Sequence, residues 1–259
     1  MSLHADRARA SSFGSDPQRY DRARPTYPDA LVEHLLDLVA GEGPVRVLDV
    51  GCGTGIASRR FANTGADVLG VEPDERMAEL ARQRGTTVEV ASFESWDSAD
   101  RTFDLIIAGQ AWHWVEPRAG AVRAAEVLRS GGVLAPFWNR GTHPEVDEAF
   151  DRIYRERTPE DFARNPTLGP ARRWSPDPEV VAAIEATSSF DPVEQAEFEW
   201  DRRYTRDEWL DQLPSHSEHS LLPPTVLAHL LDGIGEAIDA VGGSFTMHYA
   251  TATLIARRR

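Results

Sequence analysis

Three glycines at alternate positions follow a short apolar run that ends in an aspartate. The segment Asp49–Gly55 reads D-V-G-C-G-T-G. Glycine permits a tight turn, and it lets a ligand approach the backbone where any Cβ would exclude it. The segment therefore predicts a loop that binds a ligand, although a purely structural strand-to-helix turn is the alternative.

A second carboxylate, Glu72, ends the next apolar run about 20 residues later, where an acidic side chain can accept both hydroxyls of a ribose. The dinucleotide fingerprint G-x-G-x-x-G would require glycine at position 56, where this chain has Ile56. Asp49 would also repel a pyrophosphate, whereas it suits a cationic amino group. The two carboxylates together predict a ligand with an adenosine ribose and a cationic amino-acid tail.

An aromatic segment, Gln110–Trp114 (QAWHW), follows the apolar run at 103–108. Tryptophan faces attract cations, and His113 is a candidate general base near neutral pH. Alternatively, the tryptophans pack a helix start and His113 caps a backbone group. The remaining histidines show no metal-ligand spacing, and the single cysteine excludes a cysteine-based zinc cluster, so we expect no metal.

Short apolar runs that alternate with helical patterns position these residues. This rhythm predicts a parallel sheet with right-handed crossovers. We expect strands at 45–50, 67–71, 86–91, 103–108 and 132–138, with helices at 31–39, 56–63, 74–84 and 117–129.

The rhythm breaks after Asn139. Residues 141–243 are predicted to form a lid or substrate insertion with helical pieces and one strand at 194–204. Residues 244–259 supply a final strand. The first 25 residues read as irregular or weakly helical. The chain thus divides into an arm (1–30) that covers the ligand, a core (31–140), the insertion and the last strand.

Charge and composition narrow the class of protein. The 259 residues carry 28 basic side chains, all arginine, against 42 acidic ones, which gives a net charge of −14. Such a surface repels nucleic-acid backbones. The apolar stretches are far shorter than the roughly 20 residues of a membrane span, and the first residues lack the apolar core of a secretory signal. We expect a cytoplasmic protein, monomeric or homodimeric, without nucleic-acid or membrane partners.

The motifs resemble class I S-adenosylmethionine-dependent methyltransferases of the methyltransferase type 11 group. The matching segments are D-V-G-C-G-T-G at 49–55, V-E-P at 71–73, F-D-L-I-I-A at 103–108 and L-R-S-G-G at 128–132, where Ser130 replaces the usual proline. The arm segment Y-x-x-x-R-P-x-Y-P at 20–28 is similar to a subgroup that includes trans-aconitate methyltransferases. The resemblance implies an α/β fold: a Rossmann-like, doubly wound, mostly parallel sheet with an antiparallel last strand and a helical lid.

The resemblance also implies which residues bind the cofactor, S-adenosylmethionine. The glycine loop would contact its methionine part, Glu72 its ribose, and the segment after the third strand its adenine edge. The expected cofactor contacts are Tyr20, Arg24, Asp49, Gly51, Cys52, Gly53, Thr54, Gly55, Glu72, Pro73, Met77, Ser92, Phe93, Glu94, Ala108 and Gln110.

The expected function is methyl transfer to a small-molecule acceptor at oxygen or nitrogen, carboxylates included, with S-adenosylhomocysteine as product. A base such as His113 is needed only if the acceptor must lose a proton. Two alternatives remain at this point. One is a nicotinamide-dependent oxidoreductase, and the other is a non-catalytic module that binds S-adenosylmethionine.

Overall fold

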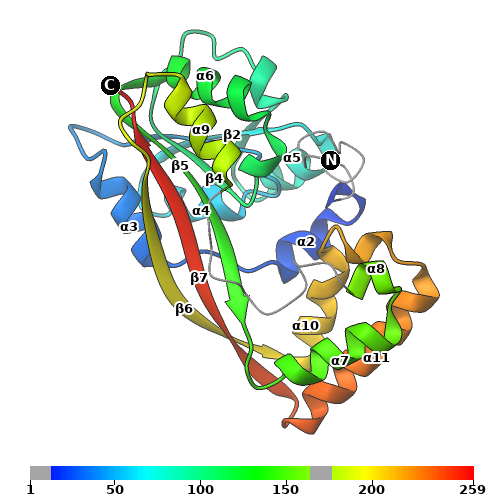
Figure 1. Ribbon diagram of the computed structural model, residues 1–259. Coiled ribbons are helices and arrows are strands. Elements are labelled where there is room, and N and C mark those ends of the chain that lie inside the picture. Colours follow the sequence, from blue (N-terminus) through cyan, green and yellow to red (C-terminus); the bar gives the residue numbers. More distant parts are fainter. Residues whose placement is uncertain (1–12, 164–176) are drawn as a thin grey trace.

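The computed structural model describes residues 13–163 and 177–259. Within these ranges a seven-stranded sheet has the order β3-β2-β1-β4-β5-β7-β6 (Figure 1). Its strands are β1 (Arg46–Val50), β2 (Asp67–Glu72), β3 (Thr87–Val90), β4 (Phe103–Gly109), β5 (Leu128–Thr142), β6 (Glu194–Thr205) and β7 (Ser244–Arg257). The α-helices are α2 (Pro17–Ala23), α3 (Asp29–Asp37), α4 (Ile56–Ala62), α5 (Glu75–Gln83), α6 (Pro117–Val127), α7 (Asp147–Arg157), α8 (Glu160–Ala163), α9 (Pro178–Ala186), α10 (Arg206–Gln212) and α11 (Pro224–Ala240).

The strands from β3 to β5 run parallel, whereas β7 is antiparallel to both β5 and β6. Parallel neighbours require crossover connections, and the crossover helices cover both faces of the sheet. The predicted Rossmann-like, mostly parallel sheet with an antiparallel last strand is confirmed. The chain order reverses between β1 and β4, and ligands bind at the carboxyl ends of such strands.

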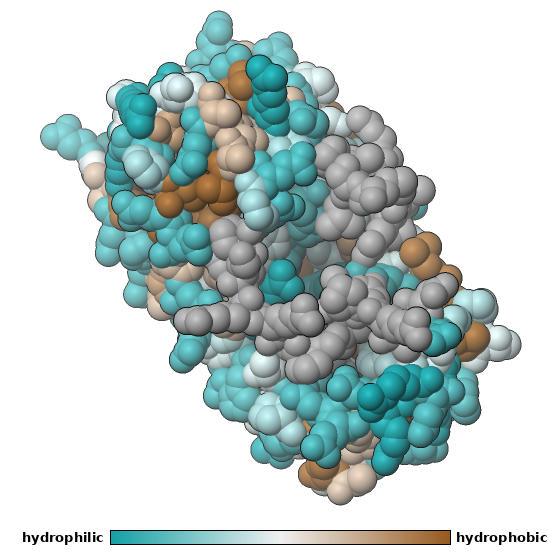
Figure 2. All heavy atoms as spheres, viewed as in Figure 1, coloured by the Kyte–Doolittle hydropathy of each residue, from teal (hydrophilic) through white to brown (hydrophobic). Residues whose placement is uncertain are grey.

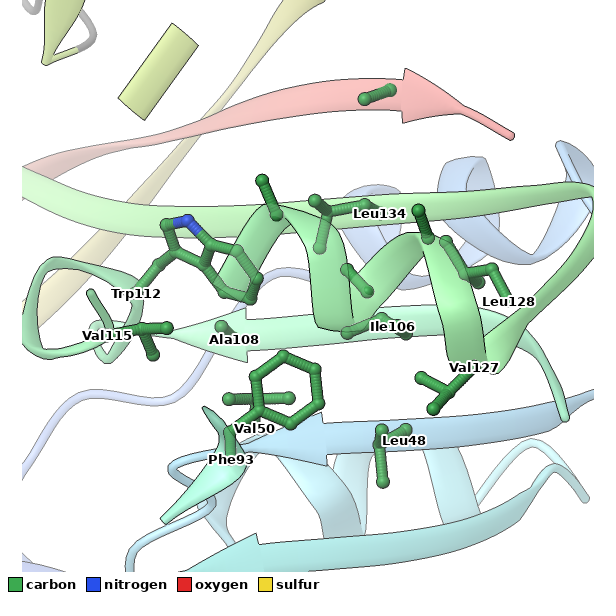
Figure 3. Close-up of a cluster of buried hydrophobic side chains, with 14 of the residues drawn as sticks. Leu48, Val50, Phe93, Ile106, Ala108, Trp112, Val115, Val127, Leu128 and Leu134 are labelled. Atoms are coloured by element: carbon green, nitrogen blue, oxygen red, sulfur yellow. The ribbon is translucent and has the colours of Figure 1, made fainter. Parts of the chain in front are cut away.

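Successive residues of each central strand enter opposite cores because side chains alternate along a strand. Val47 packs on the face covered by α3 and α4. Leu48 and Val50 pack on the other face, under α6 and α9. Figure 3 shows these two side chains beside Ile106 in the second core. Both cores hold the carboxyl ends of β1 and β4 in fixed positions.

A third core forms the lid. Its apolar side chains come from α7, α10 and α11 and from the far ends of β6 and β7, among them Tyr204, Phe245 and Tyr249. Figure 1 shows α7, α8, α10 and α11 gathered beyond the sheet, away from α6 and α9. The strands β6 and β7 therefore belong to the sheet and also contribute side chains to the core of the lid.

The arm helix α2 packs between the two parts, against α5 of the core and α10 of the lid. Asp16 caps its first turn by accepting a hydrogen bond from the Arg19 N–H at 3.0 Å. Asp21 forms ion pairs with Arg59 at 2.7 Å and Arg84 at 3.2 Å. A helix of seven residues is marginal alone, so these contacts explain why it is regular where the sequence predicted an irregular or weakly helical segment.

The strand β5 is longer than expected and runs to Thr142 rather than ending near Trp138. Pairing with β7 continues along this extension, from Asn139 with Thr251 to Thr142 with His248. In the described ranges no helix is both long and apolar enough to cross a bilayer. Most side chains on the face in Figure 2 are hydrophilic.

Candidate functional site

The glycine loop turns with left-handed backbone conformations. Gly51 and Gly53 have φ angles of 64° and 58°. A Cβ at Gly51 would lie 2.7 Å from the Cβ of Ala111, so a larger residue would not fit there. A Cβ at Gly53 would point toward Met77 and Tyr20, at 3.5 and 4.0 Å. The loop thus keeps its backbone open to the space below α2.

Glu72 is buried at the carboxyl end of β2 and braces this loop. Its Oε2 accepts a hydrogen bond from the Gly53 N–H at 2.8 Å, and its Oε1 accepts one from the Asp74 N–H at 2.9 Å. Burial raises the pKa of Glu72 to about 7, and these two backbone hydrogen bonds oppose the rise. Each carboxylate oxygen has a further lone pair for a ligand hydroxyl.

Asp49 is almost fully buried at the end of β1. The Ser58 hydroxyl donates to its Oδ2 at 2.6 Å, whereas its Oδ1 is buried without a hydrogen-bond partner among the described residues. Burial raises the pKa of Asp49 to about 7, the Ser58 hydrogen bond lowers it, and the nearby charge of Glu72 raises it further. An unpaired buried acceptor is costly, so this oxygen is suited to a cationic donor.

Arg24, which directly follows α2, joins the arm to the lid. Its Nη2 donates to the Ser215 carbonyl at 2.8 Å, and its Nη1 lies 3.4 Å from Nδ1 of His216. The guanidinium carbon lies 4.9 Å from the centre of the Tyr20 ring. The Nε of Arg24 is buried and has no partner among the described residues. This nitrogen is suited to an anionic acceptor.

A pocket at the carboxyl edge of the sheet brings Asp49 and Arg24 together, whereas Glu72 lies outside its lining. Asp49, Arg24 and Tyr20 line it, together with most of the glycine loop. Gln110 lines it as well, with an unusual φ of 58° for a non-glycine residue, and donates to the Asn139 carbonyl at 3.2 Å. Such backbone strain persists where surrounding structure enforces it, often at functional sites.

The other expected cofactor residues differ from one another in burial and in their contacts. Phe93 is buried in the core against Trp112, at 6.0 Å between ring centres. Glu94 accepts a hydrogen bond from the Glu116 N–H at 2.9 Å, which ties one of its oxygens to the start of α6. Met77 is buried beneath the loop. Pro73 is exposed, Ser92 is half-buried, and Cys52, Thr54 and Ala108 are buried.

His113 lies beside this edge in a short 3₁₀ turn, Trp112–Trp114. The indole N–H of Trp138 donates to Nδ1 of His113 at 3.1 Å. The neutral ring must then carry its proton on Nε2. Trp112 is fully buried in the core, so its role is packing. The base role of His113 stays a prediction.

Asn139 and Tyr27 are among the pocket-lining residues that sequence reasoning missed. Asn139 donates to the Thr26 carbonyl at 2.9 Å and accepts from the Thr251 hydroxyl at 2.6 Å. The side chain of Tyr27 packs on Phe137, 4.7 Å between ring centres. Asn139 follows the apolar run of β5, and a polar residue in that place is the signal that could have identified it.

Known proteins resemble this chain along most of its length. A family model for a methyltransferase domain matches residues 48–135. An uncharacterized methyltransferase from Mycobacterium bovis is 31% identical over 229 residues, which cover 88% of this chain and 85% of the relative. A malonyl-acyl-carrier protein O-methyltransferase from Pseudescherichia vulneris is 28% identical over 199 residues, 73% of this chain and 78% of the relative.

Solved structures share the fold. A protein from Anaeromyxobacter dehalogenans named a type II methyltransferase has a TM-score of 0.65 and 26% identity, over 91% of this chain and 97% of that one. Phosphoethanolamine N-methyltransferase 2 from Haemonchus contortus, solved with S-adenosylhomocysteine and phosphomonomethylethanolamine, has a TM-score of 0.54 and 15% identity, over 99% of this chain and 59% of that one. The relatives, the glycine loop and its flanking carboxylates lead to one conclusion: the chain belongs to the class I S-adenosylmethionine-dependent methyltransferases and is an enzyme of that family.

Proposed function

We propose that the pocket binds the amino-acid end of S-adenosylmethionine between Asp49 and Arg24, and that the enzyme methylates a small-molecule acceptor at oxygen or nitrogen. One observation carries the proposal. Oδ1 of Asp49 and Nε of Arg24 belong to oppositely charged groups, both are buried without partners among the described residues, and both residues line one pocket. The ammonium and carboxylate of an amino acid would satisfy them together.

The glycine loop and Glu72 would hold the middle of the cofactor. Glu72 keeps lone pairs for the two ribose hydroxyls while it braces the N–H groups of Gly53 and Asp74. The remaining loop residues, Gly51, Cys52, Thr54 and Gly55, would contact the methionine part through the backbone. Gly53 has no side chain to fill the space toward Tyr20, which a Cβ there would approach to 4.0 Å.

The adenine would lie between α5 and the turn at Ser92–Glu94. Met77 and Pro73 would pack on its faces, and the backbone of Phe93 would face its edge. The Oε1 of Glu94 is held by the Glu116 N–H, so the other oxygen would accept from the adenine amino group. Ala108 and Gln110 would face the transferred methyl group from the end of β4.

Bound S-adenosylmethionine supplies a methyl carbon activated by its positive sulfur. The protein then has to align an acceptor with that carbon and exclude water, which is proximity catalysis. The arm and the lid are suited to this closing role because Arg24 contacts both the pocket and Ser215 of the lid. O-methylation has a precedent in the Pseudescherichia relative, and N-methylation has one in the Haemonchus enzyme.

Family membership decides against the nicotinamide-dependent oxidoreductase and the non-catalytic module. The trans-aconitate-like subgroup, which rests on the arm segment at 20–28, stays a prediction. We also propose a cytoplasmic location, supported by a single buried cysteine. A monomer and a homodimer are both compatible with these residues.

The test compares two ligands by isothermal titration calorimetry. S-Adenosylhomocysteine has the amino-acid end, and 5′-methylthioadenosine lacks it. Asp49→Asn and Arg24→Gln should weaken binding of the first at least tenfold and change binding of the second little. Asp37→Asn and Arg118→Gln, on exposed positions, are the matched controls. Unchanged affinity for S-adenosylhomocysteine in both site variants would overturn the proposal.

A further inference from the structure

The part of β5 that extends past Trp138 carries an arginine. Arg140 is on the β5 extension, directly after Asn139, which lines the cofactor pocket. Pairing with β7 is continuous from Phe137 to Thr142, so side chains alternate regularly there. Asn139 faces the arm, where it binds Thr26. Arg140 therefore shares the opposite face with Trp138, about 7 Å further along the strand.

That face also holds His113, to which the Trp138 indole donates at 3.1 Å. Arg140 thus lies two residues beyond Trp138 along β5, toward the carboxyl edge of the sheet. Ligands of open α/β sheets bind beyond this edge. Arg140 therefore lies near the ligand-binding edge of the sheet, on the opposite face of β5 from the pocket-lining Asn139.

The side chain of Arg140 forms no hydrogen bond or ion pair with any residue in the ranges 13–163 and 177–259. Arg140 pairs with Ala250 on β7, and Ala250 pairs in turn with Glu199 on β6. The backbones of Arg140 and Glu199 are therefore two strand spacings apart, about 10 Å. Asp201, two residues after Glu199 on β6, lies within hydrogen-bond distance of His248, with 2.7 Å between its Oδ1 and the histidine Nδ1. Among the residues that the structure describes, the Arg140 side chain therefore has no ion-pair partner.

Arg140 is exposed but partly desolvated. Its side chain is exposed to solvent, yet protein surrounds it closely enough that desolvation lowers its pKa.

We propose that Arg140 anchors the acceptor by binding a carboxylate, so that the substrate is a small anionic acid. The proposal deepens the proposed function and rests on it. A guanidinium binds carboxylate in bidentate fashion, which also fixes its orientation. A protein with a net charge of −14 repels small acids in general, so an unpaired local cation is needed to select them.

The first test uses labelled methyl transfer from S-adenosylmethionine to a metabolite extract of the source organism. Passing the extract through an anion exchanger should lower incorporation at least tenfold, and the eluted anions should restore it. With those anions, Arg140→Gln should lose at least tenfold in activity, Arg140→Lys should retain part of it, and Arg118→Gln should match the wild type. Full activity with the anion-depleted extract, or in Arg140→Gln, would overturn the proposal.

The second test measures binding directly. The wild-type protein saturated with S-adenosylhomocysteine is titrated with benzoate, succinate and citrate and with their neutral amides. At least one acid should bind tenfold tighter than its amide, and Arg140→Gln should remove that difference without changing S-adenosylhomocysteine affinity. Equal binding of acids and amides by the wild-type protein would overturn the proposed role of Arg140 and would leave the proposed function standing. Failure of the wild type to bind S-adenosylhomocysteine would refute the proposed function, and with it this inference.

Discussion

Glu72 accepts a hydrogen bond from the Gly53 N–H, so the side chain expected to hold a ribose also fixes the loop that would hold the methionine part. Glu72→Ala should weaken S-adenosylhomocysteine binding by roughly 1.5–3 kcal/mol, as for a hydrogen bond to a charged group. It should also lower the midpoint of thermal unfolding, because the Gly53 and Asp74 N–H groups lose their acceptor.

Calorimetry and thermal unfolding separate the two roles of Glu72. Glu72→Gln keeps the side chain's size but presents an amide N–H₂ to one of the two backbone donors, so its affinity should fall between wild type and Glu72→Ala. Glu79→Gln, on an exposed part of α5, should behave as wild type. Unchanged affinity in folded Glu72→Ala would show that another group binds the ribose.

Ligand binding should depend on pH through Asp49. Burial raises the pKa of Asp49 to about 7 in the unliganded protein, and an ammonium ligand favours the ionised form. Binding therefore requires loss of a proton, and the affinity for S-adenosylhomocysteine at pH 6 should be about tenfold weaker than well above pH 7. Titrations from pH 5.5 to 7.5 test this, and Asp49→Asn should flatten the dependence.

The same raised pKa values predict how the stability of the unliganded protein depends on pH. Asp49 and Glu72 are protonated in the folded state at pH values where the unfolded chain is ionised. Their contribution to stability is therefore present below the unfolded-state pKa and is lost as pH rises through about 7. The thermal shift produced by ligand should grow between pH 5.5 and 7.5. A constant shift would mean that neither group titrates in this window.

The arm should be held to the lid by Asp211. Arg22 donates to both oxygens of Asp211, at 2.8 and 3.0 Å, and Arg19 donates to one of them at 3.1 Å. Each partly exposed ion pair contributes about 0–1 kcal/mol. Asp211→Asn should therefore weaken S-adenosylhomocysteine binding by a few-fold and increase hydrogen exchange in residues 18–27. Asp207→Asn, on the same helix, is the control.

Ligand should reverse this effect if the arm covers the cofactor. Saturating S-adenosylhomocysteine should protect residues 18–27 from exchange, while α11 changes less, because Arg24 gains a contact only in the bound state. Deleting residues 1–24 should weaken binding and abolish turnover while the sheet stays folded. Equal exchange with and without ligand, or full activity after the deletion, would remove Tyr20 and Arg24 from the site.

Local patterns predicted the sheet and the places of two candidate site residues in it. Asp49 and Glu72 each end an apolar run, and parallel strands place their carboxyl ends at one edge. The predicted range 103–108 agrees closely with β4, Phe103–Gly109. These features depend on neighbours in sequence, so they are readable without the structure.

Contacts between distant segments were not predictable in the same way. Arg24 and Ser215 are 191 residues apart, and no periodic pattern specifies their hydrogen bond. The helix α2 is short and depends on partners in α4, α5 and α10. The extension of β5 past Asn139 depends on pairing with β7, whereas its own sequence, N-R-G-T, resembles a loop.

The last prediction concerns His113. A general base contributes about 10²–10⁴-fold to the rate, whereas a carboxylate acceptor is already ionised and needs no base. The Trp138 indole occupies Nδ1 of His113, so accepting a proton there would require that hydrogen bond to break. We therefore expect His113→Ala to lower kcat by less than tenfold, with the same pH profile as wild type between pH 6 and 8.

Two variants separate packing from proton transfer at this position. Trp138→Phe removes the indole N–H but keeps an aromatic ring, and it should leave the kcat profile unchanged if His113 is a pocket wall. His113→Gln retains a hydrogen-bonding side chain of similar reach and should restore most of what His113→Ala loses. If kcat falls by 10²-fold or more in both His113 variants, and the acidic limb of the profile disappears with it, His113 is the base and the acceptor loses a proton during transfer.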